Sequence, residues 1–165
     1  MSQQPLSVGD IAPDFTLRDQ NGADVTLAEL TRDRAVLLVF YPFAFSGVCT
    51  SELREIRDDL GRFESPAVTT VAISCDPMFS LRAWADREGY FFPLLSDFWP
   101  HGAVASAYGV FDPGAGMAGR GTFLVGRDGR VAWRLVNPAG ERREFSGYER
   151  ALETLQDAAA AGGAR

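Results

Sequence analysis

Cys49 is the residue of this sequence whose surroundings most clearly predict chemistry. An apolar run over residues 35–41 is typical of a buried strand, and it ends at Pro42. Beyond Cys49 the apolar residues recur three or four positions apart, as one face of a helix requires: Leu53, Ile56, Leu60 and Phe63. Cys49 therefore lies at or just inside the beginning of a helix that follows a strand. Free amide groups and the positive end of the helix dipole favour a thiolate there, so Cys49 is a candidate nucleophile.

The polar residues around Cys49 strengthen this interpretation. Ser46 is a candidate N-cap, whose hydroxyl could bond the first free amides and contact an incoming oxygen substrate. Glu52 lies one helical turn beyond Cys49 on the same face. An unpaired carboxylate there would oppose a thiolate, so we expect a cation to neutralise it. The first choice is Arg120, which stands between two glycines that allow close approach of the backbone, just before an apolar run.

Four residue types at fixed spacing, with an arginine far along the chain, resemble the active-site signature of the peroxiredoxins: Pro42-x-x-x-Ser46-x-x-Cys49, Glu52 and Arg120. The family usually has threonine where this chain has Ser46, and serine keeps the hydroxyl. The resemblance covers residues from about 8 to 155, including an opening strand with the sequence APDFTL at 12–17. The segments LSDFWPHGAV at 95–104 and YGVF at 108–111 are more narrowly similar to the AhpE-type, one-cysteine peroxiredoxins of actinobacteria.

The resemblance implies a thiol-dependent peroxidase without cofactor or metal. The Cys49 thiolate would attack the terminal oxygen of hydrogen peroxide or an organic hydroperoxide and become a sulfenic acid. In that family scheme Pro42 shields the sulfur, Ser46 and Arg120 stabilise the leaving oxygen, and Glu52 orients the arginine. An external thiol, either mycothiol with mycoredoxin or a thioredoxin-type protein, would then reduce the sulfenic acid. The family also implies a homodimer or a higher homo-oligomer.

Cys75 leaves an alternative open. It ends an apolar run at 68–74, where a packed thiol would serve as well as any other small apolar residue. We therefore expect a structural thiol and leave Cys75 out of the catalytic set. The alternative is an atypical two-cysteine peroxiredoxin, in which Cys75 attacks oxidised Cys49. A second alternative is a peroxide sensor or thiol-dependent holdase, in which oxidation of Cys49 signals and does not turn over.

Other enzyme classes fit the sequence less well. A thiol–disulfide oxidoreductase is disfavoured because Cys49-Thr50-Ser51-Glu52 lacks the second cysteine of a CxxC pair. A Cys–His hydrolase would need a base, and the sole histidine, His101, lies in a loop segment where a structural role is expected. No cluster has metal-ligand spacing, and no glycine-rich segment has the strand-to-helix context of a phosphate site.

Composition narrows the class of partners. The formal charge of −6, from 16 basic and 22 acidic residues, argues against nucleic acid and anionic membranes. No stretch approaches about 18 consecutive apolar residues, and the first residues lack the pattern of a signal peptide. Two distant cysteines do not form a disulfide scaffold, so we expect a cytoplasmic protein. The length predicts one domain over 1–165, and the resemblance implies a core at about 8–155. The Ala- and Gly-rich residues 157–165 predict a frayed tail.

The elements predicted around the site alternate between strands and helices. An Asn-Gly pair at 21–22 is typical of a β-hairpin between residues 15–18 and 24–27. Parallel pairing of the runs 35–41 and 68–74 around the Cys49 helix would form a βαβ unit. The other predicted elements are a helix after Pro77, a strand at 91–95, a helix at 104–108, a hairpin of 122–126 with 131–136, and a closing helix bearing Tyr148, Leu152 and Leu155. This order predicts the α/β class, with a central mixed β-sheet flanked by helices and an N-terminal β-hairpin. It is compatible with the thioredoxin-like fold that the resemblance implies.

Aromatic residues near the site have two candidate roles. They are Phe43, Phe45, Phe98 and Trp99. They could form an apolar mouth for organic hydroperoxides, or they could form a contact between two copies of the chain.

Overall fold

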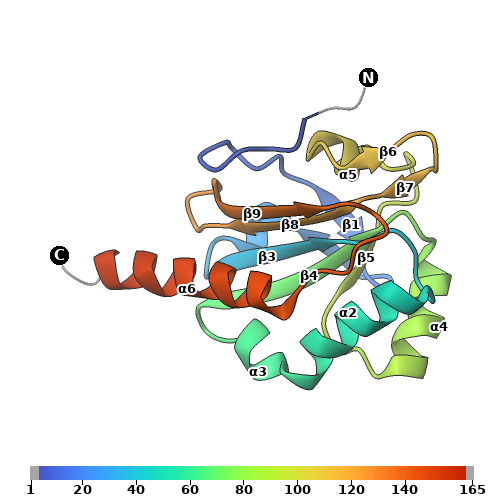
Figure 1. Cartoon of the computed structure of the whole chain (residues 1–165), viewed down its shortest axis with the longest axis horizontal. Helices are drawn as coiled ribbons and strands as arrows, with labels where there is room; N and C mark the ends of the chain where they lie inside the picture. The colour runs from blue at the N-terminus through green and yellow to red at the C-terminus, as the bar shows by residue number, and fades with distance from the viewer. Residues whose placement is uncertain (1–3, 163–165) are drawn as a thin grey trace.

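Two parallel strands form the centre of the sheet in the computed structural model, which describes residues 4–162 (Figure 1). They are β3 (Ala35–Phe40) and β4 (Val68–Ser74), paired from Ala35 opposite Val68 to Phe40 opposite Ile73. Every residue of both strands is buried, as expected of parallel strands that are covered on two faces. The predicted βαβ unit around Cys49 is therefore confirmed.

Five further strands extend the sheet on both sides of this pair. β8 (Arg120–Val125) runs antiparallel to β3, and β9 (Val131–Asn137) runs antiparallel to β8. On the other side β5 (Leu94–Ser96) runs parallel to β4, followed by the N-terminal hairpin of β1 (Thr16–Arg18) and β2 (Asp24–Thr26). The spatial order is β2-β1-β5-β4-β3-β8-β9. The predicted mixed sheet and N-terminal hairpin are confirmed.

Helices cover both faces of this sheet (Figure 1). One face carries four helices: α2 (Gly47–Asp58), α3 (Leu60–Phe63), α4 (Met78–Glu88) and α6 (Phe145–Gly162). The other face carries short elements: α1 (Leu27–Leu30), α5 (Ala103–Ala107) and the strand pair β6 (Phe111–Asp112) and β7 (Met117–Ala118).

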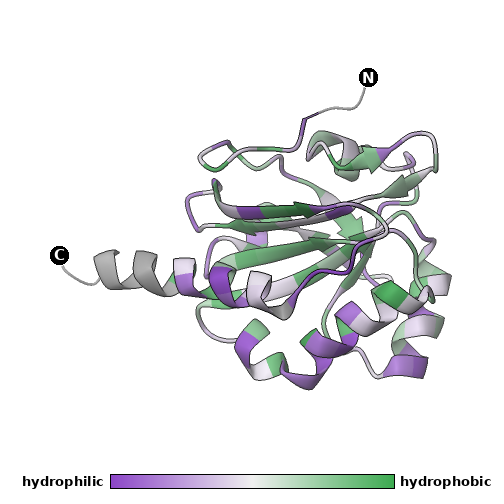
Figure 2. Ribbon diagram, viewed as in Figure 1, coloured by the Kyte–Doolittle hydropathy of each residue, from purple (hydrophilic) through white to green (hydrophobic). Residues whose placement is uncertain are grey.

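The two faces of the sheet bury two separate apolar cores. Alternate residues of β3 point to opposite sides, so Leu37 and Val39 enter one core while Val36 and Leu38 enter the other. The helix-side core lies under α2, α3, α4 and α6 and includes Cys49. The other, which we call the hairpin-side core, lies under α5 and β7 and contains the N-terminal segment. Figure 2 shows the central strands coloured as hydrophobic between these layers.

The structure moves some predicted boundaries and adds short elements. β5 begins at Leu94, three residues later than predicted, because Pro93 has no N–H for a ladder and Phe91 is 87% exposed. The helix expected at 104–108 spans Ala103–Ala107. The helix predicted to run from Cys49 past Phe63 is divided at Asp59 into α2 and α3. The sequence did not predict α1, β6 or β7, each of which has four residues or fewer and so lacks a measurable period.

The last helix, α6, includes part of the predicted tail. It is helical as far as Gly162, in agreement with the high helix propensity of alanine, and the fraying of 157–165 stays a prediction. Residues 163–165 of that expected tail lie outside the described part of the chain. Figure 1 shows the end of α6 extending beyond the sheet. Across residues 4–162, the helices lack the combination of length and apolar character that a membrane crossing requires.

Candidate active site

Cys49 is the third residue of α2, and its side chain is fully buried. Ser46 occupies the N-cap position in an extended conformation, and the Thr50 N–H donates to the Ser46 carbonyl over 2.9 Å. The amides of Gly47, Val48 and Cys49 precede that bond, so the helix itself offers them no acceptor. The sulfur therefore belongs to the first turn of α2, at its positive end.

The loop between β3 and α2 is fixed by contacts with neighbouring elements. The Ala44 N–H donates to Asp76 Oδ2 over 2.8 Å, and the Ser74 hydroxyl donates to the same oxygen over 2.7 Å. Phe45 has a φ of +67°, which is uncommon for a residue other than glycine. Its ring centroid lies 6.2 Å from that of Trp84 on α4. These contacts position the first turn of α2.

Arg120 reaches Cys49 because β8 lies beside β3. The two strands are antiparallel, so the first residue of β8 lies near the end of β3 that leads into the site. Arg120 Nη1 donates to Cys49 Sγ over 3.5 Å and also to Glu52 Oε1. Arg120 Nε donates to the Ala139 carbonyl over 2.7 Å, which fixes the plane of the guanidinium. The structure therefore brings together the cysteine, the carboxylate and the distant arginine that the sequence analysis selected.

A second arginine, Arg143, also binds Glu52, and the sequence did not predict it. Arg143 donates its backbone N–H over 2.8 Å and its Nη1 over 3.2 Å to Glu52 Oε2. Its Nη2 donates to the Gly121 carbonyl over 3.3 Å. The sequence offered a weak signal here, because Arg142 and Arg143 are adjacent in a segment without period. Arg142 turns outward to Ser51, and only the structure distinguishes the two.

Cys49, Glu52, Arg120 and Arg143 form what we call the buried charge cluster. Their exposed fractions are 0%, 0%, 3% and 1%. Two guanidinium groups and one carboxylate leave a net charge of +1, and a thiolate at Cys49 brings the sum to zero. An unbalanced charge in a dry interior is costly. Burial raises the pKa of the adjoining Tyr148 to about 12, so that its hydroxyl stays neutral and leaves this balance unchanged.

The prediction that the Ser46 hydroxyl caps α2 is wrong. Ser46 holds the N-cap position, but its hydroxyl makes no capping hydrogen bond. Instead the Ser46 carbonyl accepts from both the Thr50 N–H and the Thr50 hydroxyl, so the backbone of Ser46 anchors the first turn. The Ser46 Oγ is buried and has no hydrogen-bond partner among residues 4–162. Pro42, the remaining predicted site residue, is buried at the point where β3 ends and the loop to α2 begins.

Cys75 lies apart from this cluster. It belongs to the hairpin-side core and is 4% exposed, whereas Cys49 belongs to the helix-side core. Burial, with a smaller contribution from Asp97, raises the pKa of the Cys75 thiol to about 12, against a hydrogen bond from the Ala118 backbone that lowers it. Cys75 is therefore a protonated, packed thiol at neutral pH, as a structural role requires.

His101 also has a structural environment. Its Nδ1 lies 3.0 Å from the Phe98 carbonyl oxygen, and its Nε2 lies 2.7 Å from the Gly116 carbonyl oxygen. These contacts join the loop before α5 to the segment before β7. His101 therefore links two loops by hydrogen bonds, on the face of the sheet opposite Cys49. These contacts agree with the predicted structural role.

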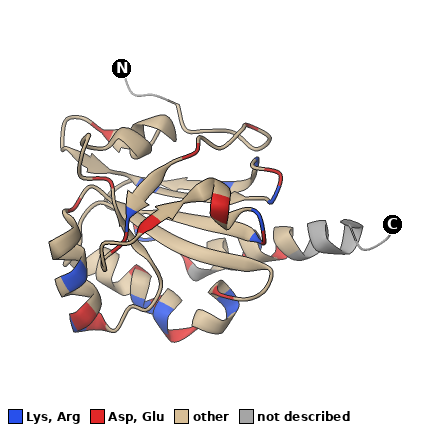
Figure 3. Cartoon of the chain, turned by 180° about the vertical axis from the view of Figure 1, so that it is seen from behind, with Lys and Arg blue, Asp and Glu red and all other residues tan. Residues whose placement is uncertain are grey.

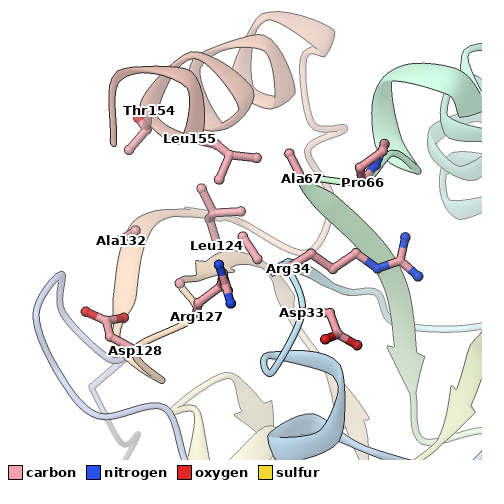
Figure 4. A pocket seen from close by; sticks show the side chains of 12 residues that line it. Asp33, Arg34, Pro66, Ala67, Leu124, Arg127, Asp128, Ala132, Thr154 and Leu155 are labelled. Atoms are coloured by element: carbon pink, nitrogen blue, oxygen red, sulfur yellow. The ribbon is translucent and has the colours of Figure 1, made fainter. Parts of the chain in front are cut away.

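A cavity of about 450 Å³ lies under α6, away from Cys49 (Figure 4). Its lining combines apolar side chains with two arginines and two aspartates, among them Ala35, Leu124, Arg34, Arg127, Asp33 and Asp128. It opens at the edge of the sheet where β3 and β4 begin, whereas Cys49 follows the edge where β3 ends. This cavity is therefore separate from the buried charge cluster.

Comparison with known proteins gives consistent matches. A family model described as AhpC/TSA family matches residues 8–134, a range that includes Cys49, Glu52 and Arg120 and ends before Arg143. Alkyl hydroperoxide reductase E of Mycobacterium tuberculosis is 49% identical over 150 residues, covering 91% of this chain and 98% of that protein. The crystal structure of peroxidoxin BcpB from Mycobacterium tuberculosis has a TM-score of 0.78 at 31% identity, covering 91% of this chain and 96% of that chain. The reduced 2-Cys peroxiredoxin of Plasmodium vivax has a TM-score of 0.83 at 26% identity, covering 96% of this chain and 86% of that chain.

Proposed function

We propose that this chain, which belongs to the AhpC/TSA family, performs its chemistry with the thiolate of Cys49. The chain is a peroxiredoxin, a thiol-dependent peroxidase with a thioredoxin-like fold. Its proposed substrates are hydrogen peroxide and organic hydroperoxides. We treat 1–165 as one domain with its core at 8–155, because both apolar cores share the same sheet.

One observation supports the site above all others. Arg120 Nη1 contacts both Cys49 Sγ, at 3.5 Å, and Glu52, within the buried charge cluster. A guanidinium in that position favours the thiolate before reaction and faces the place where negative charge develops during it. Glu52 binds the guanidinium of Arg120, and Arg143 binds the other carboxylate oxygen of Glu52, so we assign Glu52 and Arg143 as positioning residues.

The proposed reaction is a displacement at oxygen. The Cys49 thiolate attacks the terminal oxygen of a peroxide ROOH, the S–O bond forms, and the O–O bond breaks. The sulfur is oxidised to a sulfenic acid, and the leaving alkoxide takes a proton and departs as ROH. A low thiol pKa explains only part of a fast reaction with peroxide, because the nucleophilicity of a thiolate falls together with its basicity. Contacts made to the leaving oxygen in the transition state must therefore supply much of the rate.

Ser46 provides one of these contacts in the proposed mechanism. Its hydroxyl is buried, belongs to the residue before the first turn of α2, and has no partner among residues 4–162. A peroxide oxygen would give that hydroxyl the hydrogen bond that it lacks. The free amides of the first turn and Arg120 would bind the same oxygens, and Pro42 would shield the sulfur from water.

The sulfenic acid is proposed to be reduced by an external thiol. Cys75 and Cys49 lie in cores on opposite faces of the sheet, which disfavours the atypical two-cysteine alternative. Mycothiol with mycoredoxin, or a thioredoxin-type protein, are the reductants that the family resemblance suggests. Because neither cysteine is in a disulfide and turnover needs a supply of thiol, we propose the cytoplasm as the site of action.

A homodimer is also proposed, with one face of the chain as its interface. Phe79, Phe98 and Trp99 are 72%, 46% and 81% exposed. They line a hollow of about 620 Å³ together with Met78. Adjacent exposed aromatic residues of this kind mark interaction surfaces. A Trp99→Glu variant is expected to shift the mass measured by sedimentation towards the monomer, and an unchanged dimer mass would contradict this interface.

Intact-mass analysis tests the peroxidase mechanism most directly. Wild type and Cys49→Ser, both reduced, are each exposed to one equivalent of peroxide in the presence of dimedone. We expect one dimedone adduct at Cys49 in the wild type and none in the variant. With excess dithiothreitol the wild type should consume many equivalents of peroxide. Consumption that stops near one equivalent would favour the sensor or holdase alternative instead, and oxidation that does not depend on Cys49 would overturn the proposal.

A further inference from the structure

A groove runs between α2 and α4 beside the first turn that holds Cys49. Gly47, Thr50 and Arg54 of α2 line one side, and Trp84, Arg87 and Glu88 of α4 line the other. Its volume is about 250 Å³. Phe45 closes one end, with its ring against that of Trp84. We call this the α2–α4 groove.

The groove carries an excess of positive charge. Its one carboxylate, Glu88, is 7% exposed and already receives two hydrogen bonds from Arg54, at 2.7 and 3.1 Å. Arg57 adds a further ion pair at 3.8 Å. Arg87 is 72% exposed, and its guanidinium approaches Glu88 only to 3.9 Å, so its positive charge remains available to a ligand. Two of the three charged residues that line the groove are basic, in a chain of net charge −6, and Figure 3 shows basic and acidic segments on these two helices.

The other polar groups of the groove are also donors. Gly47 opens α2, where the amide N–H groups lack helical acceptors. Trp84 is fully buried, and its indole N–H has no hydrogen-bond acceptor among residues 4–162. The Thr50 hydroxyl already donates to the Ser46 carbonyl. A ligand that suits the groove therefore supplies acceptors and negative charge, which a carboxylate does.

The position of the groove connects it with the oxidised sulfur. Thr50 is bonded to Cys49 along the chain, and Gly47 lies in the same turn. Arg120 contacts the sulfur from β8, a different element from the helices that form the groove. Arg120 and Ser46 do not line the groove, so a molecule there leaves these two proposed peroxide contacts free. Cys49 is fully buried and does not line the groove, so reduction by a thiol held there requires the first turn of α2 to open.

We propose that the α2–α4 groove binds the carboxylate of a small anionic thiol that reduces oxidised Cys49. This inference rests on the proposed peroxidase function and narrows the class of reductant, favouring such a thiol over an uncharged one such as mycothiol. The thiolate RS⁻ attacks the sulfur of the sulfenic acid, an S–S bond forms, and the S–O bond breaks to release hydroxide, which leaves as water. A second RSH then attacks the mixed disulfide, which releases the Cys49 thiol and RSSR.

Thiols of different charge test this site. Reduced protein is oxidised with one equivalent of peroxide, and loss of the sulfenic acid is followed by stopped-flow fluorescence with 3-mercaptopropionate or with 2-mercaptoethanol. Rates are divided by the thiolate fraction of each reagent, because reactivity follows the thiolate. In the wild type we expect 3-mercaptopropionate to react about tenfold faster, the ratio that a difference of about 1.4 kcal/mol produces. In Arg87→Glu that advantage should disappear.

Arg32→Glu is the matched control. It makes the same change of charge at an exposed position outside the groove, and it should keep the wild-type ratio between the two thiols. Equal rates with both thiols in the wild type would overturn the inference, as would an equal fall of both rates in Arg87→Glu. The preceding oxidation by peroxide is recorded for every protein. If Cys49 of the wild type fails to oxidise, the proposed function fails before the groove is tested.

Discussion

Cys49 and Cys75 lie on opposite faces of the central sheet. Cys49 packs in the helix-side core and Cys75 in the hairpin-side core, with the backbone of the sheet between them. A disulfide requires Cβ atoms about 3.5–4.5 Å apart that point towards each other. Direct bonding of the two sulfurs would therefore need a rearrangement of the strand end that carries Cys75. This relationship is the physical basis for assigning a one-cysteine mechanism.

Replacement of Cys75 should leave the peroxidase cycle intact. In Cys75→Ala, one equivalent of peroxide should add one oxygen atom to Cys49, as in the wild type, and turnover with dithiothreitol should stay within about twofold. Mass spectrometry and free-thiol counting measure both results. Loss of two hydrogens with both thiols consumed, in the wild type but not in the variant, would restore Cys75 as the resolving residue.

Cys75 should also make stability depend on alkaline pH. Its pKa is raised to about 12 in the folded protein, mainly by burial, and lies near 8.5 in an unfolded chain. A raised folded pKa contributes stability that is complete below the unfolded pKa and is lost as the pH rises towards 12. The advantage of wild type over Cys75→Ala in free energy of unfolding should therefore shrink above pH 8.5, by up to about 1.4 kcal/mol per pH unit.

Urea denaturation of both proteins at pH 8 and pH 10.5, under reducing conditions, measures this change. Tyrosines whose pKa is raised by burial are present in both proteins, so their contribution cancels in the difference. A constant difference between the two pH values would show that Cys75 ionises as readily in the folded chain as in the unfolded one.

Arg120 should contribute more to the reaction than to the ionisation of the thiol. In Arg120→Ala we expect the rate of peroxide attack to fall by about 10²–10³, the usual effect of removing one donor to a developing oxyanion. The thiolate fraction, followed by ultraviolet absorbance, should fall by less, because α2 and Arg143 still favour it. Arg32→Ala, at an exposed position, is the control. Equal losses of rate and of thiolate would limit Arg120 to a role in ionisation.

The sequence predicted the parts of the site that depend on local pattern. Cys49 at the beginning of α2 follows from the end of one apolar run and the onset of helical spacing, both within twenty residues. Arg120 and Glu52 could be chosen because an isolated carboxylate beside a thiolate requires a cation. The spacing of the site residues matched the signature of a known family. The fold class followed from the order of the predicted strands and helices.

The remaining features depend on packing that no local pattern records. Arg143 comes from an irregular segment, and its adjacent residue Arg142 has the same side chain with the opposite exposure. The direction of the Ser46 hydroxyl depends on the side-chain rotamer. Packing against the surrounding residues determines that rotamer, and the N-cap position alone does not. Very short elements such as α1 exist because tertiary contacts hold them, and isolated segments of that length do not form helices in water.

Arg142 and Arg143 should differ sharply in their contribution to stability. Arg143→Ala removes one of the two cations on the fully buried Glu52, and breaking such a buried pair costs about 3–5 kcal/mol. Arg142 pairs with Glu55 at the surface, where its side chain is 46% exposed, so Arg142→Ala should cost less than about 1 kcal/mol. Urea denaturation at pH 7 compares the two variants. Similar losses would mean that the buried charge cluster is far more hydrated than this structure describes.

Ser46 should matter for the rate and hardly at all for stability. Loss of a capping hydroxyl usually costs about 0.5–2 kcal/mol, but the Ser46 hydroxyl makes no capping bond, so Ser46→Ala should change the free energy of unfolding by less than about 0.5 kcal/mol. If the hydroxyl bonds the charged leaving oxygen, a contact of about 1.5–3 kcal/mol is lost and the rate of peroxide attack should fall roughly 10- to 100-fold. Ser46→Thr keeps the hydroxyl and should retain most of the rate. If Ser46→Ala loses stability but keeps the wild-type rate, the Ser46 hydroxyl caps the helix and makes no catalytic contact.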